Sequence, residues 1–384
     1  MISITNKRHS FSNLKCNAAN LETPLTSYQL PVTSYQKGSF FTGNWTLTPV
    51  NYSLCFFLFA LCLSCAIPES KVAQPGSPPV TGKGQIEILT SNRERKLLPI
   101  VGIRYVRTLG SAGQGAGEFQ MPLGLAIDEA DRIYIADAGN NRVQVIDATG
   151  NYITEFGGRG WQTGEFDHPS DIALSFQRSY RHLYVADTRN NRVQYCNFVD
   201  QIFYPLNQSI EGTLLDQPEG IGIGRNGEVY VVDTSNHRWI EFNVAGVPVV
   251  ARGSFGSGTE QFWNPTDLAV DTHGNVYVVD TGNHLIKKYD FSGNPISVWG
   301  GEGNRPGQLR EPKYIALDDW NYLYITDSGN RRIQVFAPDG KSIAEFTTPT
   351  LLEPIGIAVS KSGRVFVSDA EANNIKVFQV FRKK

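Results

Sequence analysis

The sequence predicts an all-β fold, a six-bladed β-propeller with four strands in each blade. Three observations carry this prediction: a unit recurs six times along the chain, short apolar alternations separated by turn residues fill every unit, and helical periodicity is absent from the repeats. The 384 residues include 37 Gly and 20 Pro, and only 19% of them are charged. This composition disfavours disorder, coiled coil and collagen.

Each unit opens at a proline and carries an aspartate further on. The prolines are Pro122, Pro169, Pro218, Pro265, Pro312 and Pro354, and the aspartates are Asp137, Asp187, Asp233, Asp280, Asp327 and Asp369. The aspartate follows its proline at the same spacing in five units, and residues 176–182 lengthen one turn of the second unit. Six matches at a near-constant offset indicate a true repeat.

The first unit shows the four expected strands most clearly. They cover residues 123–128, 133–137, 142–147 and 152–157, and polar turns separate them. Four strands in a unit of about 45 residues are typical of a propeller blade.

The two ends of the repeat array complement each other. The sixth unit has only three strands, whereas residues 105–110 form a strand that precedes the first unit and has no blade of its own. We expect this strand to complete the last blade and close the ring, which removes two exposed sheet edges. The propeller is therefore assigned to residues 103–384.

The units resemble the NHL repeat. Asn283-His284-Leu285 spells its name, and the variants are Asn140-Asn141-Arg142, Asn190-Asn191-Arg192, Asn236-His237-Arg238 and Asn330-Arg331-Arg332. The sixth unit is expected to carry one extra residue before Asn373-Asn374-Ile375. The resemblance covers about three quarters of the chain and implies the propeller fold. It implies less about function, because one scaffold hosts many activities.

Residues that recur in every blade are expected to serve the fold. The aspartates should accept backbone N–H groups in their turns, and Arg142, Arg192, Arg238 and Arg332 should brace neighbouring blades. Function is expected where the pattern is broken, on the face that carries the loops from each fourth strand to the next blade. Exposed aromatic and arginine side chains are enriched at interfaces, so the binding-face candidates are Arg159, Trp161, Phe255, Trp263, Arg305 and Arg310. The alternative for Trp263 is packing, as expected for Phe119, Phe166, Phe262 and Leu309.

A second group of candidates lies at the axial channel, where the residues that follow each blade proline should project. The channel candidates are Asp171, Glu219, Asp267, Lys313 and Tyr314. They predict a solvated channel mouth with Lys313 as counter-charge. No cofactor is expected, and the alternative is Ca²⁺ held by the three carboxylates.

Two catalytic precedents bear on this reading. The peptidyl-α-hydroxyglycine lyase resembles this scaffold but places zinc-binding histidines directly after the blade prolines. The residues found there are Leu123, Ser170, Glu219, Thr266, Lys313 and Ile355, which cannot form a zinc triad. The gluconolactonase-like propellers would need an acidic calcium site in the channel. A metal-dependent enzyme therefore stays the alternative to a non-catalytic recognition propeller.

RNA binding is the second alternative, because tripartite-motif proteins bind single-stranded RNA through a basic NHL propeller. The net charge here is −2, and a polyanion-binding protein normally has a basic excess. The expected partner is a protein or a small molecule rather than nucleic acid, and the propeller is expected to be monomeric.

The N-terminal residues predict export. Residues 1–51 form an extension, residues 52–66 a hydrophobic signal or anchor segment, and residues 67–102 a Pro/Gly/Ser-rich linker. Cleavage after Ala66, lipidation of Cys65 and an uncleaved anchor are three alternatives. The expected location is the cell envelope, through a lipid or membrane tether, or the exterior after secretion.

Overall fold

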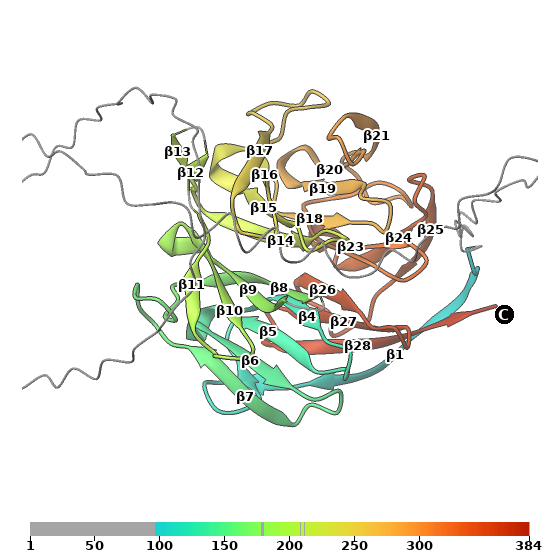
Figure 1. Ribbon diagram of the computed structural model, residues 1–384. Coiled ribbons are helices and arrows are strands. Elements are labelled where there is room, and N and C mark those ends of the chain that lie inside the picture. The colour runs from blue at the N-terminus through green and yellow to red at the C-terminus, as the bar shows by residue number, and fades with distance from the viewer. Residues whose placement is uncertain (1–96, 178–179, 208, 211, 384) are drawn as a thin grey trace, which may run out of the picture. The chain divides into compact units, whose positions relative to one another are not determined.

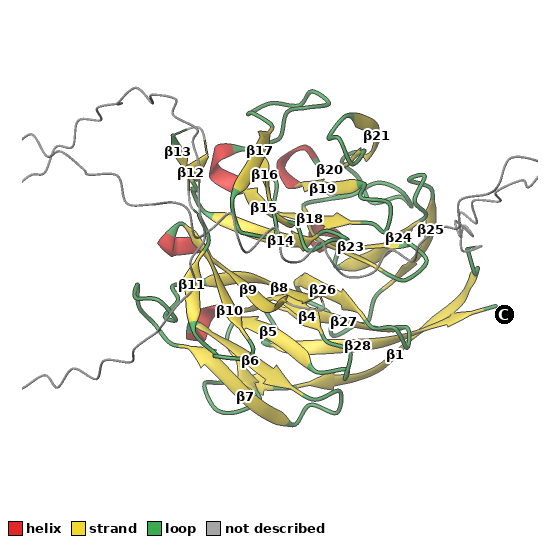
Figure 2. Ribbon diagram, viewed as in Figure 1, coloured by secondary structure: helices red, strands yellow, loops and turns green. Residues whose placement is uncertain are grey.

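The computed structural model describes residues 97–177, 180–207, 209–210 and 212–383. Six four-stranded antiparallel sheets form a ring of blades, so the predicted six-bladed β-propeller is confirmed (Figure 1). The described part of the chain contains no α-helix, and its helical turns are five 3₁₀ turns, η1 to η5 (Figure 2).

Each blade is built from strands that follow one another in the chain. Blade 1 contains β4 (Pro122–Ile127), β5 (Ile133–Asp137), β6 (Arg142–Ile146) and β7 (Tyr152–Gly157). Blade 2 contains β8 (Pro169–Gln177), β9 (Tyr180–Asp187), β10 (Arg192–Asn197) and β11 (Phe203–Pro205). Blade 3 contains β14 (Pro218–Ile223), β15 (Val229–Asp233), β16 (Arg238–Phe242) and β17 (Pro248–Arg252). The first three blades thus follow the strand order expected from the repeat.

Blades 4 and 5 repeat the same order. Blade 4 contains β18 (Asp267–Val270), β19 (Val276–Asp280), β20 (Leu285–Tyr289) and β21 (Pro295–Gly300). Blade 5 contains β22 (Pro312–Leu317), β23 (Leu323–Asp327), β24 (Arg332–Phe336) and β25 (Ser342–Phe346). Four short strands lie outside the blades: β2 (Ser111–Ala112), β3 (Glu118–Phe119), β12 (Ser209–Ile210) and β13 (Thr213–Leu214).

Blade 6 closes the ring as the sequence predicts. Its inner strands are β26 (Pro354–Val359), β27 (Arg364–Asp369) and β28 (Asn374–Arg382), and β1 (Ile100–Leu109) is its outer strand. β1 pairs antiparallel with β28, from Ile100 opposite Arg382 to Leu109 opposite Ile375. The propeller thus begins at Ile100 rather than at residue 103.

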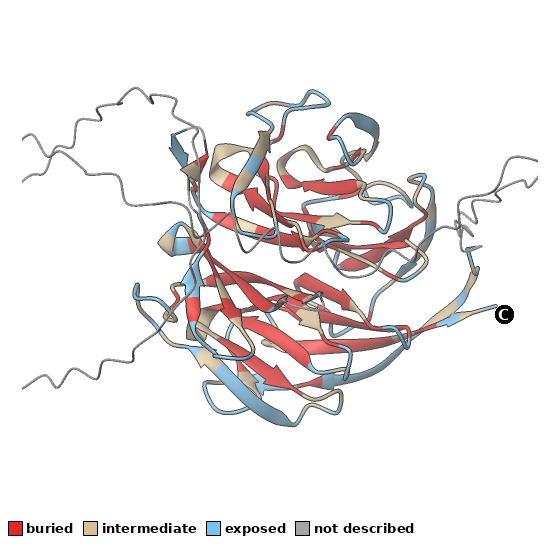
Figure 3. Ribbon diagram, in the orientation of Figure 1, coloured by how far each residue is buried: buried red, intermediate tan, exposed pale blue. Residues whose placement is uncertain are grey.

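The core lies between neighbouring blades. The second strand of blades 1, 3, 4 and 5 is buried along its whole length, whereas the outer strands are largely exposed (Figure 3). Phe119, Phe166, Phe262 and Leu309 are fully buried beneath the connecting loops, as expected for packing residues. Burying the faces of the sheets against each other is the main stabilising contribution.

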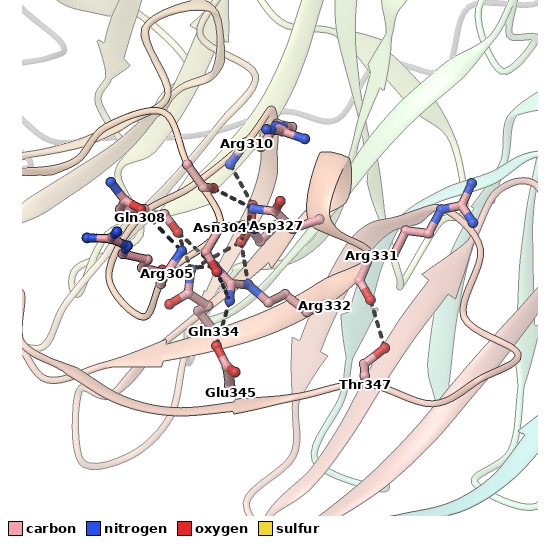
Figure 4. A network of polar contacts seen from close by, with 12 residues as sticks. Asn304, Arg305, Gln308, Arg310, Asp327, Arg331, Arg332, Gln334, Glu345 and Thr347 are labelled. Carbon is pink, nitrogen blue, oxygen red and sulfur yellow. Dashed lines mark hydrogen bonds and ion pairs between the residues drawn. The ribbon is translucent and has the colours of Figure 1, made fainter.

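The repeated aspartates are structural. In blades 1 to 5 their backbone donors lie in the entering loop rather than in the expected turn, and in blade 6 Asp369 also accepts the N–H of Ala372 in its own turn. Asp327 accepts the backbone N–H of Arg310 at 2.7 Å, from the connecting loop two residues before the blade proline, rather than from its own turn (Figure 4). Equivalent bonds join Asp137 to Gln120, Asp187 to Asp167, Asp233 to Asp216, Asp280 to Trp263 and Asp369 to Leu352. Each aspartate therefore ties a turn to the loop that enters the same blade.

The prediction that the arginines brace neighbouring blades is wrong. Arg332 pairs with Asp327 of its own blade at 2.7 Å, and it donates to the carbonyl oxygens of Asn304, Arg305 and Gln308 in the entering loop (Figure 4). Arg142 and Arg192 do the same in blades 1 and 2. The guanidinium group reaches loop carbonyls because the loop folds back over the Asp turn.

Neighbouring blades are joined instead by the residue after the 3₁₀ turn, which has a left-handed backbone. Asn141, with φ 57°, accepts the backbone N–H of His168 at 2.9 Å. Asn191, His237, His284 and Asn373 make the same contact with the following blade. Asn and His fit this position because each offers a side-chain acceptor, and Asn is also well tolerated in the left-handed region.

This contact also shows that the prediction of an extra residue in the sixth repeat is wrong. Asn373 has φ 53° and bonds the N–H of Met121, so it is the equivalent of Asn141. Asp369 lies opposite Asn374, just as Asp137 lies opposite Arg142. The sixth turn therefore has the normal length, with Ala372 in place of the usual Asn.

Candidate functional site

One face of the propeller carries both the connecting loops and the 3₁₀ turns, and we call it the loop face. Backbone bonds hold the two together in each blade; the N–H of Gly282 in η4 (Thr281–Asn283), for example, donates to the carbonyl oxygen of Trp263 at 2.8 Å. The loops are thus fixed onto the sheets, and the side chains that they expose have defined positions.

Two of the binding-face candidates meet in an aromatic cluster. The rings of Phe255 and Trp263 lie 6.3 Å apart and nearly perpendicular, and the His237 ring lies 5.1 Å from Phe255. Phe255 is 63% exposed and Trp263 is 49% exposed, so Trp263 does not join the buried packing residues. We call His237, Phe255 and Trp263 the aromatic cluster.

A glycine makes room for this cluster. A Cβ atom at Gly282 would lie 2.6 Å from Cγ of Trp263, which is too close for any other residue. The indole therefore lies across η4 and keeps its outer surface in solvent. The hydrogen bond from Gly282 to the carbonyl oxygen of Trp263 fixes the backbone that carries the indole.

The cluster is specific to the junction of blades 3 and 4. Phe255 forms an isolated bridge with Phe262, and the corresponding bridges of two other loops place Arg159 and Glu302 at that position. The position of Trp263, two residues before the blade proline, holds Gln120, Asp167, Asp216, Arg310 and Leu352 elsewhere. An otherwise symmetric frame thus carries one aromatic surface.

The remaining binding-face candidates lie apart from the cluster. Trp161 is 76% exposed, and within the described residues its ring contacts no other aromatic ring. Arg159 is also exposed. Arg305 and Arg310 are exposed on the loop that enters blade 5, where the Arg310 guanidinium points away from the Asp327 network (Figure 4).

Two acidic residues of the loop face stabilise their own loops. The Glu118 carboxylate accepts the N–H of Gly115 at 2.9 Å, and the Glu165 carboxylate accepts that of Gln162 at 3.0 Å. Gln261 and Gln308 take the same role in the loops that enter blades 4 and 5. The loop next to the aromatic cluster is thus closed by a neutral amide in place of a carboxylate.

The five channel candidates come together around the axis. Asp171 accepts the N–H of Ile221 at 2.8 Å, and Asp267 accepts that of Ile315 at 2.8 Å, each from the next blade. The Tyr314 hydroxyl donates to the carbonyl oxygen of Ser170 at 2.8 Å and thereby links blade 5 to blade 2.

The expected solvated channel mouth is wrong for three of these residues. Asp171, Asp267 and Tyr314 are buried, while Glu219 and Lys313 are partly exposed. The two aspartates are drawn inward because they satisfy backbone N–H groups of the neighbouring blades.

Burial changes the ionisation of this group. It raises the pKa of Asp171 and, together with the Asp171 charge, that of Asp267. Burial also raises the pKa of Glu219 to about 7, against the opposing effect of Lys313. The channel therefore holds acids that are protonated at a higher pH than in a peptide.

No group of three or more His, Cys, Asp or Glu side chains within the described ranges is arranged to hold a metal ion. Nor does any helix among those residues have the length and apolar character that a membrane span requires. Residues 52–66 and the lipidation candidate Cys65 lie outside the described residues.

Comparison with known sequences agrees with the repeat reading. The sequence model of the NHL repeat matches residues 119–146, 215–238, 262–289 and 351–378. Protein brain tumor of Drosophila melanogaster is 26% identical over 137 residues, which are 36% of this chain and 13% of that protein. Protein lin-41 of Caenorhabditis elegans is 42% identical over 50 residues, 13% of this chain and 4% of that protein. The chain thus spans a small part of these relatives.

Solved structures share the fold. A streptogramin B lyase aligns with TM-score 0.54 and 13% identity, over 72% of this chain and 98% of the lyase. A putative gluconolactonase aligns with TM-score 0.55 and 14% identity, over 74% and 95% of the two chains. At such identities the likeness shows the architecture alone.

Sequence reasoning missed His237 as part of the site. It was assigned only to the repeat motif, where it takes the place of Asn. Two features of the sequence together could have identified it: a His in place of Asn at the left-handed position of blade 3, and the aromatic Phe255 in the loop that enters blade 4. That loop folds back over the turn that carries His237, so the two rings meet.

Proposed function

The chain belongs to the NHL-repeat β-propellers, and we propose that it is a non-catalytic recognition propeller that binds a protein or a small ligand through its loop face. The observation that carries this proposal is the aromatic cluster, in which Phe255 and Trp263 keep 63% and 49% of their surface exposed on a fixed backbone. Exposed aromatic side chains held in place are the usual anchors of interfaces, because they bury a large area at little entropic cost.

Arg159, Trp161, Arg305 and Arg310 would form the outer part of the binding face. They lie on other loops of the same face, and arginine is enriched at interfaces together with tryptophan. We further propose that the propeller is exported and tethered by the segment at residues 52–66, or by a lipid on Cys65. The support is the short apolar run followed by small residues and a Pro/Gly/Ser-rich linker.

The test is affinity capture with the full-length chain from extracts of its native host, followed by identification of captured molecules. The variant Phe255→Ala/Trp263→Ala removes the cluster, and Phe291→Ala is the matched control because Phe291 is 75% exposed in the turn between β20 and β21, away from the loop face. A partner retained by the wild type and the control but lost with the double variant supports the proposal. Equal capture by all three proteins contradicts it.

A metal-dependent lyase- or lactonase-like activity in the channel is the second candidate, favoured by the raised pKa of Glu219, about 7, which suits a general acid–base group. Metal analysis of the purified protein separates the two candidates, because stoichiometric zinc or calcium would favour catalysis. Retention of RNA at low ionic strength, lost on adding salt, would favour the RNA alternative.

A further inference from the structure

A cavity of about 270 Å³ lies in the seam between blades 1 and 2. It opens near the turns that join the first to the second and the third to the fourth strands, on the face opposite the loop face. Aromatic side chains line it from both blades: Tyr134 and Phe156 from blade 1, and Phe176 and Phe198 from blade 2. Two arginines, Arg132 and Arg181, also line it.

Other seams are closed by a large side chain of the outer strand that packs onto a glycine turn of the next blade. Trp299 covers Gly340 between blades 4 and 5, where a Cβ atom would lie 2.8 Å from the indole. Arg252 covers Gly293 between blades 3 and 4 and donates to the carbonyl oxygen of Ser292 at 2.5 Å. Both glycines have positive φ, 87° and 80°. Glycine is therefore favoured at these positions for two reasons, the backbone conformation of the turn and the close approach of the covering side chain.

Blade 2 lacks this glycine turn. Its third turn is one residue longer, since the N–H of Gln201 bonds the carbonyl oxygen of Asn197. In blade 1, by comparison, Gly150 bonds Asp147, three residues earlier. Gln201 takes the left-handed position with φ 57°.

The covering side chain is displaced as a result. Phe156 packs against Phe203, with ring centroids 6.2 Å apart, instead of against a turn glycine. Phe198, from the lengthened turn, packs edge-on against Tyr134 at 6.1 Å. The β8–β9 hairpin is also longer than its counterparts and brings Phe176 and Arg181 to the seam. The cavity therefore arises where blade 2 departs twice from the repeat.

The two arginines at the cavity keep N–H groups that no carboxylate of the described residues pairs with. Arg132 uses its Nε atom for an ion pair with Asp128 at 2.5 Å and remains half-exposed. Arg181 is exposed, and its side chain has no ion pair with another described residue. Asp200 lies in the same turn as Gln201, and its carboxylate accepts the N–H of Ile202.

We propose that this cavity, the blade 1–2 pocket, binds a small carboxylate that carries an aromatic or branched aliphatic body. Apolar walls with a few fixed polar groups are typical of small-molecule sites, and guanidinium groups recognise carboxylates through paired charge-assisted hydrogen bonds. The apolar body would lie between Phe156 and Phe198, and the carboxylate would face Arg181 and the Nη atoms of Arg132. The proposal is independent of the loop face.

The experiment is titration calorimetry of the full-length chain with 3-phenylpropionate, compared with the neutral 3-phenylpropionamide of the same shape. Binding of the acid that is at least about tenfold tighter than binding of the amide supports the proposal, since a charge-assisted bond contributes on that scale. Absence of acid binding at millimolar concentration overturns it, and equal binding of acid and amide overturns the assigned chemistry.

Variants locate the site. Arg181→Gln should weaken binding of 3-phenylpropionate by about tenfold, whereas Arg104→Gln, which changes an exposed arginine of β1 in blade 6, should leave it unchanged. The Arg181 side chain has no hydrogen bond or ion pair with another described residue, so its replacement should not alter thermal unfolding, and this is measured alongside. Equal affinity of the wild type and both variants places the ligand elsewhere and overturns the assignment to this pocket.

Discussion

The Nζ atom of Lys287 forms an ion pair with Oδ2 of Asp280 at 2.8 Å, and the two side chains are only 1% and 0% exposed. In blades 1, 2 and 5 the cation that pairs with this aspartate is an arginine two residues earlier in the strand. Blade 4 has Leu285 at that position, and Lys287 occupies the place of Gln144, Gln194 and Gln334. The Lys287 ammonium also donates to the carbonyl oxygens of Gly258 and Gln261 in the entering loop.

Replacing this lysine should therefore destabilise blade 4, and restoring the arginine should repair it. Lys287→Gln leaves the Asp280 charge buried without a cation, and we expect the free energy of unfolding to fall by about 3 kcal/mol. Adding Leu285→Arg recreates the arrangement of blade 1 and should recover at least half of the loss. Urea unfolding of both variants checks this, and a double variant no more stable than the single one would contradict it.

Stability should decrease as the pH rises through neutrality because of the channel acids. Burial raises the pKa of Glu219 from its ordinary 4.5 to about 7, and that of Asp171 moves in the same direction. The folded state therefore holds protons that the unfolded chain releases, and the contribution is fully present below about pH 4 and lost as the pH passes 7. Thermal unfolding between pH 5 and 8 should show a falling midpoint, with a shallower fall for Glu219→Gln. An identical slope in the two proteins would remove Glu219 from this effect.

The contact across the axis should contribute measurably to stability. Tyr314→Phe removes the donor to the buried carbonyl oxygen of Ser170, which should cost about 1–2 kcal/mol. Tyr105→Phe is the control, because its hydroxyl bonds the Thr108 hydroxyl in an exposed part of β1 and should change stability by less than about 0.5 kcal/mol. Denaturant midpoints measure both, and equal values would show that the bond across the axis adds nothing.

Aromatic residues of the connecting loops should separate into two kinds, those that stabilise the fold and those that do not. Phe262→Ala empties a fully buried site beneath the loop and should cost about 3–5 kcal/mol. Trp161→Ala removes a largely exposed side chain and should leave the unfolding free energy within about 0.5 kcal/mol. A large loss of stability for Trp161→Ala would mean that this indole packs against the fold.

The fold was predictable because its signals are local and repeated. The proline-to-aspartate spacing and the strand alternation recur in the units, and they predicted the blades. The unpaired strand before blade 1 complements the three strands of the last unit, and it predicted the closure of the ring. The turn length of blade 6 was misread because Ala372 stands where Asn was expected, although Asn373 still takes the left-handed position.

The surfaces were less predictable because they depend on contacts between distant segments. Phe255 and Trp263 could be named as exposed candidates, but their contact with His237 requires the loop to fold back over the turn of the preceding blade. Burial of Asp171 depends on the N–H of Ile221, 50 residues away in the next blade. The sequence shows that blade 2 lacks the turn glycine and has a longer β8–β9 hairpin, but the blade 1–2 pocket also depends on how Phe156 and Phe198 pack across the seam.

The pairing of β1 with β28 has a consequence for how the protein forms. Ile100 and Arg382 pair in one sheet, so the first strand of the propeller can pair only after the last strand has been synthesised. Until β28 emerges from the ribosome, β1 presents unpaired backbone groups and exposed side chains such as Val101 and Val106, a surface prone to wrong pairing. Contacts of such long sequence separation also form slowly, so closure of the ring should be the late step of folding and the one most dependent on chaperones.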